Sequence, residues 1–282
     1  MRHSRLEKLL GIICLAVCLA LIVPSSEAKS RQDCERLYQP QTGQPGKDVV
    51  WVPTSDALVR RMLEMARTTH SDRVYDLGAG DGKIAIAAAK QFGATAVGVE
   101  NNPDMARLAQ CYVEAEGVAD KVRIVNGDIF ATDFSSATVV TLYLLPELNL
   151  RLRPTLLKMA PGTRVVSHSF LMDDWEPDER SSEQGSAYLW IVPAQVGGAW
   201  TFRENGGKET FPVNFKQQFQ KLTGTVGADR PMTTAEISGP DLTVVFEEKG
   251  APVKLSGQLK GERIEAVVTR GGKSKNFIGT RS

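Results

Sequence analysis

Apolar runs alternate with segments of helical spacing over residues 48–194. Six apolar runs have the length and composition of buried strands: 74–77, 94–100, 121–130, 137–145, 162–170 and 186–193. Four further segments have the spacing of helices: 56–68, 83–89, 104–117 and 148–159. Alternation of strand and helix over about 150 residues is typical of an α/β fold with a doubly wound, mostly parallel sheet. We therefore expect one α/β domain over residues 48–194.

The pattern changes from about residue 195 onward. Short segments with alternating apolar and polar positions follow one another there, separated by glycine-rich turns: 199–202, 211–226, 241–246, 253–259, 263–269 and 276–279. This pattern predicts an antiparallel β-barrel or sandwich, and hence an all-β domain over residues 195–282. This part resembles the small lipocalin-like barrels of exported bacterial proteins. Trp200 fits a core plug near the base of such a barrel better than an aromatic residue of a ligand pocket.

The first residues have the pattern of a secretory signal peptide. Basic residues precede an apolar run at 9–23, and small residues follow it up to Ala28. The run of about 15 residues is short for a membrane-spanning helix of about 20. An uncleaved anchor, and with it a membrane association through this segment, stays open. We predict an exported protein, periplasmic or extracellular, with residues 1–28 as signal peptide and the polar residues 29–47 as linker.

Composition and charge narrow the range of functions. The chain has 282 residues and a net charge of +1, which offers no electrostatic footprint for nucleic acid. His70 and His168 stand alone, and no cluster has metal-ligand spacing, so we predict no metal site. Without residues 1–28, only Cys34 and Cys111 remain of the four cysteines. They could pair in an oxidising compartment, but Cys111 falls in a predicted helix, which favours a buried free thiol.

The most informative stretch is the turn after the first predicted strand. Three glycines stand there at every second position: Gly78, Gly80 and Gly82. Such glycines remove the Cβ atoms from a turn that must approach something closely, here a nucleoside cofactor. A dinucleotide fingerprint requires G-x-G-x-x-G, but the third glycine comes one residue early and Lys83 takes its place, which disfavours a nicotinamide oxidoreductase. The carboxylates of Asp76 and Asp81 also oppose a pyrophosphate and suit S-adenosylmethionine, which carries an ammonium and a sulfonium.

Two further strand ends carry candidate site residues. Glu100 follows Gly82 by about 18 residues, close to the interval at which an acidic residue accepts hydrogen bonds from ribose hydroxyls. Asn101 stands beside it. Tyr143 lies at the carboxyl end of the fourth predicted strand, the edge where open α/β sheets bind ligands. We expect the methyl acceptor to meet the cofactor there.

These motifs resemble those of a known family. The sequence Asp76-Leu-Gly-Ala-Gly-Asp-Gly82 is similar to motif I of the class I S-adenosylmethionine-dependent methyltransferases. With residues 97–103, the Leu-Leu-Pro at 144–146 and Trp175-x-Pro177, it resembles the membrane-associated lysine methyltransferases that modify the ATP synthase c subunit and the adenine nucleotide translocase. The resemblance covers residues 48–194. It implies a Rossmann-like fold, S-adenosyl-L-methionine as cofactor and a protein lysine as methyl acceptor, with a small-molecule acceptor left open.

The resemblance also implies roles for single residues. Asp128 falls where the family places an acid or amide against the adenine amino group, and Ile129 is its apolar neighbour. Thr54 borders the methionine end of the cofactor, although helix capping explains Thr54 as well. Methyl transfer by in-line displacement depends mainly on positioning the two partners. Tyr143 and Glu147 are the candidates for orienting the acceptor amine.

A rival interpretation belongs to another class of function. A non-catalytic exported binding protein could retain the nucleoside pocket as a scaffold while the β domain recognises a partner. An exported enzyme would need a supply of S-adenosylmethionine outside the cytoplasm, and the sequence does not reveal one. Cofactor binding without methyl transfer would favour the scaffold.

Overall fold

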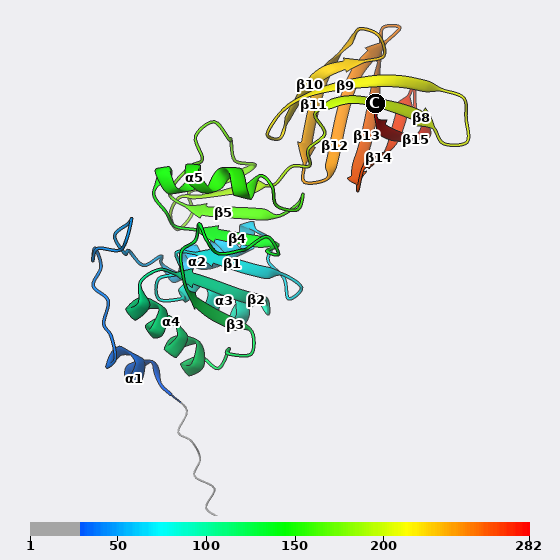
Figure 1. Ribbon diagram of the computed structural model, residues 1–282. Helices are drawn as coiled ribbons and strands as arrows, with labels where there is room; N and C mark the ends of the chain where they lie inside the picture. Colours follow the sequence, from blue (N-terminus) through cyan, green and yellow to red (C-terminus); the bar gives the residue numbers. More distant parts are fainter. Residues whose placement is uncertain (1–28) are drawn as a thin grey trace, which may run out of the picture.

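The structure, a computed structural model, describes residues 29–282 as two domains (Figure 1). An α/β domain, here called the sheet domain, ends with the strand β7 (Ala187–Ile191). A closed barrel begins with β8 (Gly198–Glu204). The predicted signal peptide lies outside the described residues.

The sheet domain is built on seven strands in the order β3-β2-β1-β4-β5-β7-β6. Its first six strands in chain order have these bounds: β1 (Arg73–Leu77), β2 (Thr95–Glu100), β3 (Val122–Asn126), β4 (Val139–Leu142), β5 (Arg164–His168) and β6 (Glu179–Ser181). Strands β1 to β5 pair in parallel, whereas β7 runs antiparallel to both β5 and β6. The predicted doubly wound, mostly parallel sheet is confirmed. The short edge strand β6 was not predicted.

Helices cover both faces of this sheet, as the strand-helix alternation requires. The helices have these bounds: α1 (Arg31–Glu35), α2 (Asp56–Met65), α3 (Lys83–Phe92), α4 (Pro103–Ala115) and α5 (Pro146–Leu156). Buried side chains of α2, α3 and α4 form one core with one face of the sheet, and those of α5 form a second core with the opposite face. Ser55 caps the start of α2, where its hydroxyl accepts from the Leu58 amide, and Asn102 caps the start of α4, with Pro103 in the first turn.

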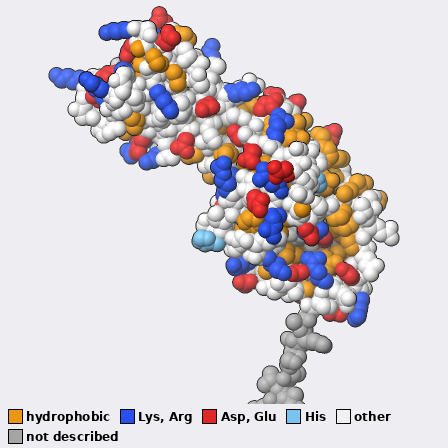
Figure 2. Space-filling view, turned by 180° about the vertical axis from the view of Figure 1, so that it is seen from behind, with side chains coloured by type: hydrophobic (Ala, Val, Ile, Leu, Met, Phe, Trp, Pro, Cys, Tyr) orange, Lys and Arg blue, Asp and Glu red, His pale blue; other side chains and the backbone are white. Residues whose placement is uncertain are grey.

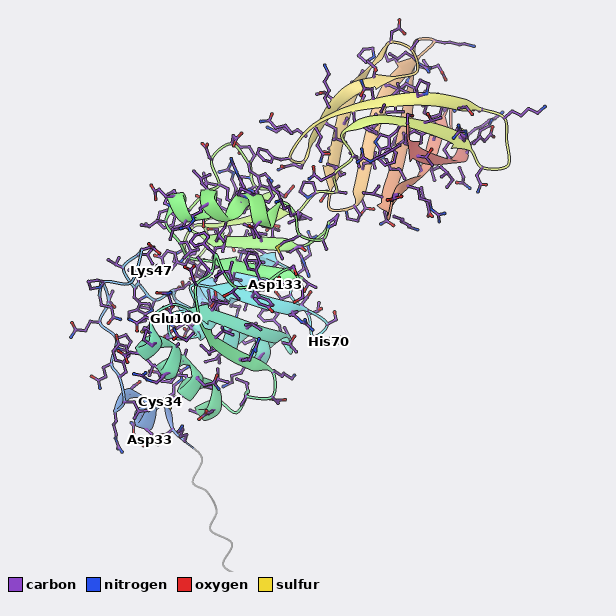
Figure 3. All side chains as sticks on the ribbon, viewed as in Figure 1. Asp33, Cys34, Lys47, His70, Glu100 and Asp133 are labelled. Atoms are coloured by element: carbon purple, nitrogen blue, oxygen red, sulfur yellow. A yellow bond between two sulfur atoms is a disulfide. The ribbon has the colours of Figure 1, made fainter. Side chains whose placement is uncertain are left out.

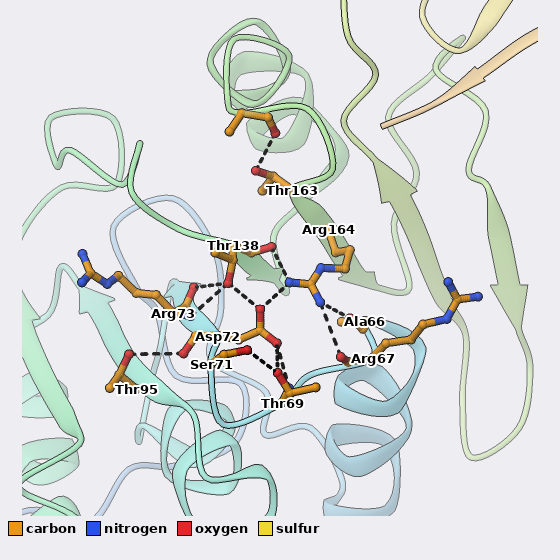
Figure 4. Close-up of polar contacts among 11 residues, drawn as sticks. Ala66, Arg67, Thr69, Ser71, Asp72, Arg73, Thr95, Thr138, Thr163 and Arg164 are labelled. Carbon is orange, nitrogen blue, oxygen red and sulfur yellow. Dashed lines mark hydrogen bonds and ion pairs between the residues drawn. The ribbon is translucent and has the colours of Figure 1, made fainter. Parts of the chain in front are cut away.

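A buried ion pair fixes the amino-terminal edge of the sheet (Figure 4). Arg164 at the start of β5 pairs with Asp72, just before β1, and Asp72 also accepts from the Thr138 hydroxyl at 2.7 Å and the Thr69 amide at 2.7 Å. Burial alone would raise the pKa of Asp72, but these hydrogen bonds hold it below its ordinary value. Arg164 also donates to the Ala66 carbonyl after α2. This network joins β1, β5 and α2 at the edge opposite the strand ends that carry the candidate site.

Residues 29–54, here called the N-terminal arm, lie against the sheet domain. A disulfide between Cys34 and Cys111 joins α1 to α4 with a Cα–Cα distance of 5.7 Å. The prediction of a free thiol at Cys111 was therefore wrong, because α1 brings Cys34, 77 residues away in sequence, directly against it. Lys29 adds an ion pair with Glu114 of α4. The segment predicted as a linker is thus attached to α4 near its first residues, by the disulfide and by the Lys29 ion pair.

The C-terminal domain is a closed barrel of eight antiparallel strands. Its other strands have these bounds: β9 (Thr210–Gln218), β10 (Lys221–Val226), β11 (Arg230–Ser238), β12 (Asp241–Glu248), β13 (Ala251–Lys260), β14 (Arg263–Arg270) and β15 (Lys273–Arg281). Buried aromatic side chains fill the interior: Trp200, Phe202, Phe211, Phe215, Phe246 and Phe277. Trp200 is fully buried, its indole N–H donates to the Val196 carbonyl at 2.7 Å, and the Arg281 guanidinium lies 4.7 Å from its ring centre. It therefore serves as a core plug at one end of the barrel.

Charges of both signs intermingle over the two domains on the face shown in Figure 2. That face has no extended basic surface of the kind that binds nucleic acid. Among residues 29–282, no helix has the length and apolar character needed to cross a membrane.

Candidate functional site

A cavity of about 660 Å³ opens at the carboxyl ends of β1, β2 and β4. This volume is within the range of small-molecule sites, about 300–1,000 Å³. Its floor comes from the strand ends and the glycine turn, and its roof is the part of the N-terminal arm at residues 44–54. Lys47 and Glu100 lie at the same edge of the sheet domain, whereas His70 lies at the opposite edge (Figure 3). The cavity thus occupies the position where open α/β sheets bind ligands.

The glycine turn has a backbone that side chains would obstruct. Gly78, Gly80 and Gly82 have φ values of 83°, 54° and 77°, in the left-handed region. A Cβ atom on Gly80 would lie 2.7 Å from the indole nitrogen of Trp51 in the arm. Gly78 and Gly80 line the cavity, whereas Gly82 lies at the start of α3 and faces Ala109 of α4. Gly80 therefore lets the roof approach the glycine turn closely, Gly78 leaves room for Leu144 after β4, and Gly82 serves helix packing.

Asp76 ends β1 as a buried carboxylate with one free oxygen. Its Oδ1 accepts from the Thr141 hydroxyl at 2.8 Å, and its Oδ2 has no hydrogen-bond partner among the described residues. Burial raises the pKa of Asp76 to about 7; the Thr141 hydrogen bond opposes this shift, and the carboxylates of Asp81 and Glu100 add to it. Burial also raises the pKa of Asp81, which borders the same cavity. An acidic group in this state favours a cationic ligand, whose charge would replace the missing partner.

Glu100 is held in place by two backbone amides. Its Oε2 accepts from the Gly80 amide and its Oε1 from the Asn102 amide, both at 2.8 Å. Glu100 and Asn101 both line the cavity. Because each carboxylate oxygen keeps a second lone pair, Glu100 can still accept hydrogen bonds from a pair of hydroxyl groups.

Asp128 and Ile129 line the cavity beyond β3. Lys47 of the arm pairs with Asp128 at 2.8 Å between Nζ and Oδ2, and this hydrogen bond, with that from the Phe130 amide, lowers the pKa of Asp128. Asp128 thus stays ionised while it holds the roof down. This role of Lys47 was not predicted, because Lys47 falls in the polar segment that the sequence indicates as a linker.

Aromatic side chains form the wall at the end of β4. Tyr143 and Phe170 line the cavity with ring centres 6.3 Å apart, and His168 stacks on Tyr143 at 3.7 Å. His168 Nδ1 forms a hydrogen bond with the Thr54 hydroxyl at 3.1 Å, and burial lowers the pKa of His168. His168 is therefore neutral at physiological pH, and it connects β5 to the roof. In the sequence His168 stands alone, because its partner is 114 residues away.

The remaining predicted residues, Thr54 for the methionine end of the cofactor and Tyr143 and Glu147 for the acceptor amine, divide into two groups. Thr54 and Tyr143 border the cavity. Glu147 lies in the first turn of α5, is exposed, and is not among the lining residues. Leu145 and Leu148, on either side of it, border the cavity instead. This end of the cavity is thus mainly apolar and aromatic.

Comparisons with known proteins agree with this geometry. A family model described as "ANTKMT methyltransferase domain" matches residues 76–179. The chain is 50% identical over 151 residues to a protein-lysine N-methyltransferase of Saccharolobus islandicus, covering 51% of this chain and 94% of that protein. It is 31% identical over 171 residues to the human lysine N-methyltransferase of the ATP synthase c subunit, covering 60% of this chain and 70% of that protein. A crystal structure of an RNA methyltransferase from Salinibacter ruber with S-adenosyl-L-homocysteine matches with a TM-score of 0.50 and 48% identity, covering 51% of this chain and 96% of that one.

Proposed function

Because the chain belongs to the class I S-adenosylmethionine-dependent methyltransferases, in the family of the ATP synthase c subunit and adenine nucleotide translocase lysine methyltransferases, we propose that it methylates the side-chain amine of a protein lysine. The observation that carries the proposal is that one cavity has two parts of different chemical character. One half has a glycine turn and acidic strand ends, and the other has an apolar, aromatic wall.

The acidic half fits the cofactor. The free oxygen of Asp76 can accept from an ammonium group, and the fixed carboxylate of Glu100 can accept from ribose hydroxyls. Asp128 and Ile129 also line the cavity, and the family resemblance implies that they face the adenine. When bound, S-adenosylmethionine supplies a methyl group that its sulfonium has already activated. The protein then has to hold the acceptor amine in line with that methyl group.

The aromatic half fits a lysine side chain. Tyr143, Phe170, Leu145 and Leu148 make this part of the cavity apolar, and an apolar surrounding lowers the pKa of an approaching lysine ammonium. The ammonium can then lose its proton to water before the site closes around it, and the neutral amine presents a lone pair. The ring faces of Tyr143 and Phe170 can stabilise the methylated ammonium, which is again a cation. The neutral His168 adds no positive charge beside it.

We also propose that the protein acts in an oxidising compartment. The disulfide between Cys34 and Cys111 supports this proposal, since such bonds persist mainly in exported proteins. Fractionation of the producing cells tests it. Recovery of the protein with reduced thiols in the cytosol would contradict it.

Transfer of labelled methyl groups tests the function. The purified protein is incubated with labelled S-adenosylmethionine and an extract of membrane and soluble proteins, or with total RNA. We expect label in protein, at a lysine located by mass spectrometry. Glu100→Gln should abolish transfer, whereas Glu64→Gln, an exposed carboxylate of α2, should not. Label in RNA alone would contradict the lysine proposal, and cofactor binding without any transfer would favour the scaffold.

A further inference from the structure

Two turns of the barrel contact the sheet domain: the β11–β12 turn, where Gly239 and Pro240 lie against Gly162, and the β9–β10 turn. The ring of Phe219 in this turn stacks on Trp175 with a centroid distance of 5.9 Å and an interplanar angle of 23°. The Arg153 guanidinium of α5 lies 5.5 Å from the Phe219 ring centre. Gln220 donates to the Glu176 carbonyl at 2.6 Å. One barrel turn is therefore fitted to one loop of the sheet domain.

That loop, residues 169–178 between β5 and β6, is here called the acceptor loop, because its Phe170 forms part of the aromatic wall. Trp175 in its middle is fully buried, and the indole N–H of Trp190 donates to the Trp175 carbonyl at 2.7 Å. Arg153 donates to the Met172 carbonyl at 2.9 Å. The loop is thus held by α5, by β7 and by the barrel.

The backbone of Phe219 has a conformation that glycine adopts more readily. Phe219 has a φ of 53°, in the left-handed region, which is unfavourable for a residue that carries a Cβ atom. The other barrel hairpins have glycines with positive φ: Gly206, Gly227, Gly239, Gly250, Gly261, Gly271 and Gly272. The β9–β10 turn carries a strained aromatic residue where glycine would be free of strain. Because Lys249 of the β12–β13 hairpin has a similar φ of 54°, the stack on Trp175, and not the strain alone, indicates that Phe219 has a specific task.

The barrel itself is filled. Its interior holds tightly packed aromatic side chains, and Trp200 closes one end. The barrel can therefore contact other parts of the protein or a partner only through its outer surface and its turns.

We propose that the barrel braces the acceptor loop and that Phe219 is a positioning residue for methyl transfer. Phe219 holds Trp175 and, through the loop, keeps Phe170 in the wall that receives the acceptor. The expected effect on methyl transfer rests on the proposed function, because only that proposal assigns the aromatic wall to the methyl acceptor. Asp76 and Glu100 belong to strand ends outside the loop. Loss of the contact between the barrel and the loop should therefore weaken binding of the acceptor and leave cofactor affinity unchanged.

Substitution of Phe219 in the full-length protein tests the brace. Phe219→Gly removes the stack and also relieves the left-handed strain, so loss of function cannot arise from a strained turn. We expect the KM for the acceptor protein to rise about three- to tenfold, the effect of losing one aromatic pair, with the Kd for S-adenosylmethionine unchanged. Phe219→Trp should restore the KM. Lys249→Gly is the matched control, since Lys249 has a φ of 54° in a hairpin at the other end of the barrel.

Hydrogen–deuterium exchange separates this inference from the proposed function, because it needs no acceptor. In Phe219→Gly, we expect faster exchange of the amides of residues 169–178, with the glycine turn at 78–82 unchanged. Unchanged exchange of the acceptor loop would overturn the brace, as would a KM that Phe219→Trp does not restore. If the wild-type protein transfers no methyl group to protein, the proposed function fails, while the exchange result still decides on the brace.

Discussion

Replacement of Asp76 by asparagine should make the protein more stable at neutral pH and less able to bind its cofactor. Asp76 is 2% exposed, and its pKa is raised from 3.8 to about 7. At 1.36 kcal/mol for each tenfold difference in proton affinity, this corresponds to about 4 kcal/mol. Asparagine has the same shape, keeps an oxygen for the Thr141 hydroxyl and carries no charge.

The sign of the effect follows from proton binding. Between pH 4 and pH 7, folded protein keeps a proton on Asp76 that the unfolded chain releases. The stability that this proton provides is complete below about pH 4 and is lost as pH rises through about 7. The free energy of unfolding of Asp76→Asn, relative to wild type, should therefore rise by about 4 kcal/mol from pH 4 to pH 8. Urea denaturation at several pH values measures this difference.

Cofactor binding should favour the ionised form of Asp76, whereas folding favours the protonated form. A cationic ligand binds the ionised form of Asp76, so binding below pH 7 must release a proton, and affinity should rise from pH 6 to pH 8. Titration calorimetry in two buffers of different ionisation enthalpy measures the proton release. Asp76→Asn should bind more weakly and release no proton at this site. Equal pH dependence of unfolding in both proteins would refute the reasoning.

Three further predictions concern the roof, the glycine turn and the disulfide. Gly80→Ala should weaken cofactor binding about tenfold, because its Cβ would meet Trp51, whereas Gly117→Ala, also left-handed in φ but with open space, measures the backbone cost alone. Lys47→Ala should leave the Tm unchanged, because exposed ion pairs contribute little, but should raise the rate of cofactor dissociation in stopped-flow experiments. Cys111→Ser should lower the free energy of unfolding by about 4 kcal/mol, and treatment of wild type with reductant should give the same loss.

Local patterns were enough to predict much of the fold. The apolar runs and the glycine turn indicated the strands β1 to β5, their parallel arrangement and the edge that holds the cavity. The acidic residues Asp76, Glu100 and Asp128 all border that cavity. They could be found because each lies at or just after the end of a strand, and parallel strands place their ends along one edge.

Contacts between distant segments were not predictable in the same way. Residues 29–47 are polar and contain proline and glycine, so they lack the periodicity that indicates a roof. His168 is linked to Thr54 across 114 residues, and Cys34 to Cys111 across 77. Glu147 is close in sequence to Tyr143 but turns outward on α5. In each case the position of the residue depends on tertiary packing against a segment that is distant in sequence or on the direction in which a helix faces.

The bond from Cys34 to Cys111 closes a covalent ring that contains the roof of the cavity, the glycine turn, Asp76 and Glu100. The roof is consequently attached to the sheet domain at both ends, by Cys34 and by the start of α2. The roof can therefore move away from the cavity, and let a cofactor pass, only as far as the conformational freedom of residues 35–55 allows. Reduction would remove the covalent tether and leave the arm attached at this end only by noncovalent contacts such as the ion pairs of Lys29 with Glu114 and Lys47 with Asp128. Exchange of product for fresh cofactor would then follow the thiol–disulfide balance of the surroundings.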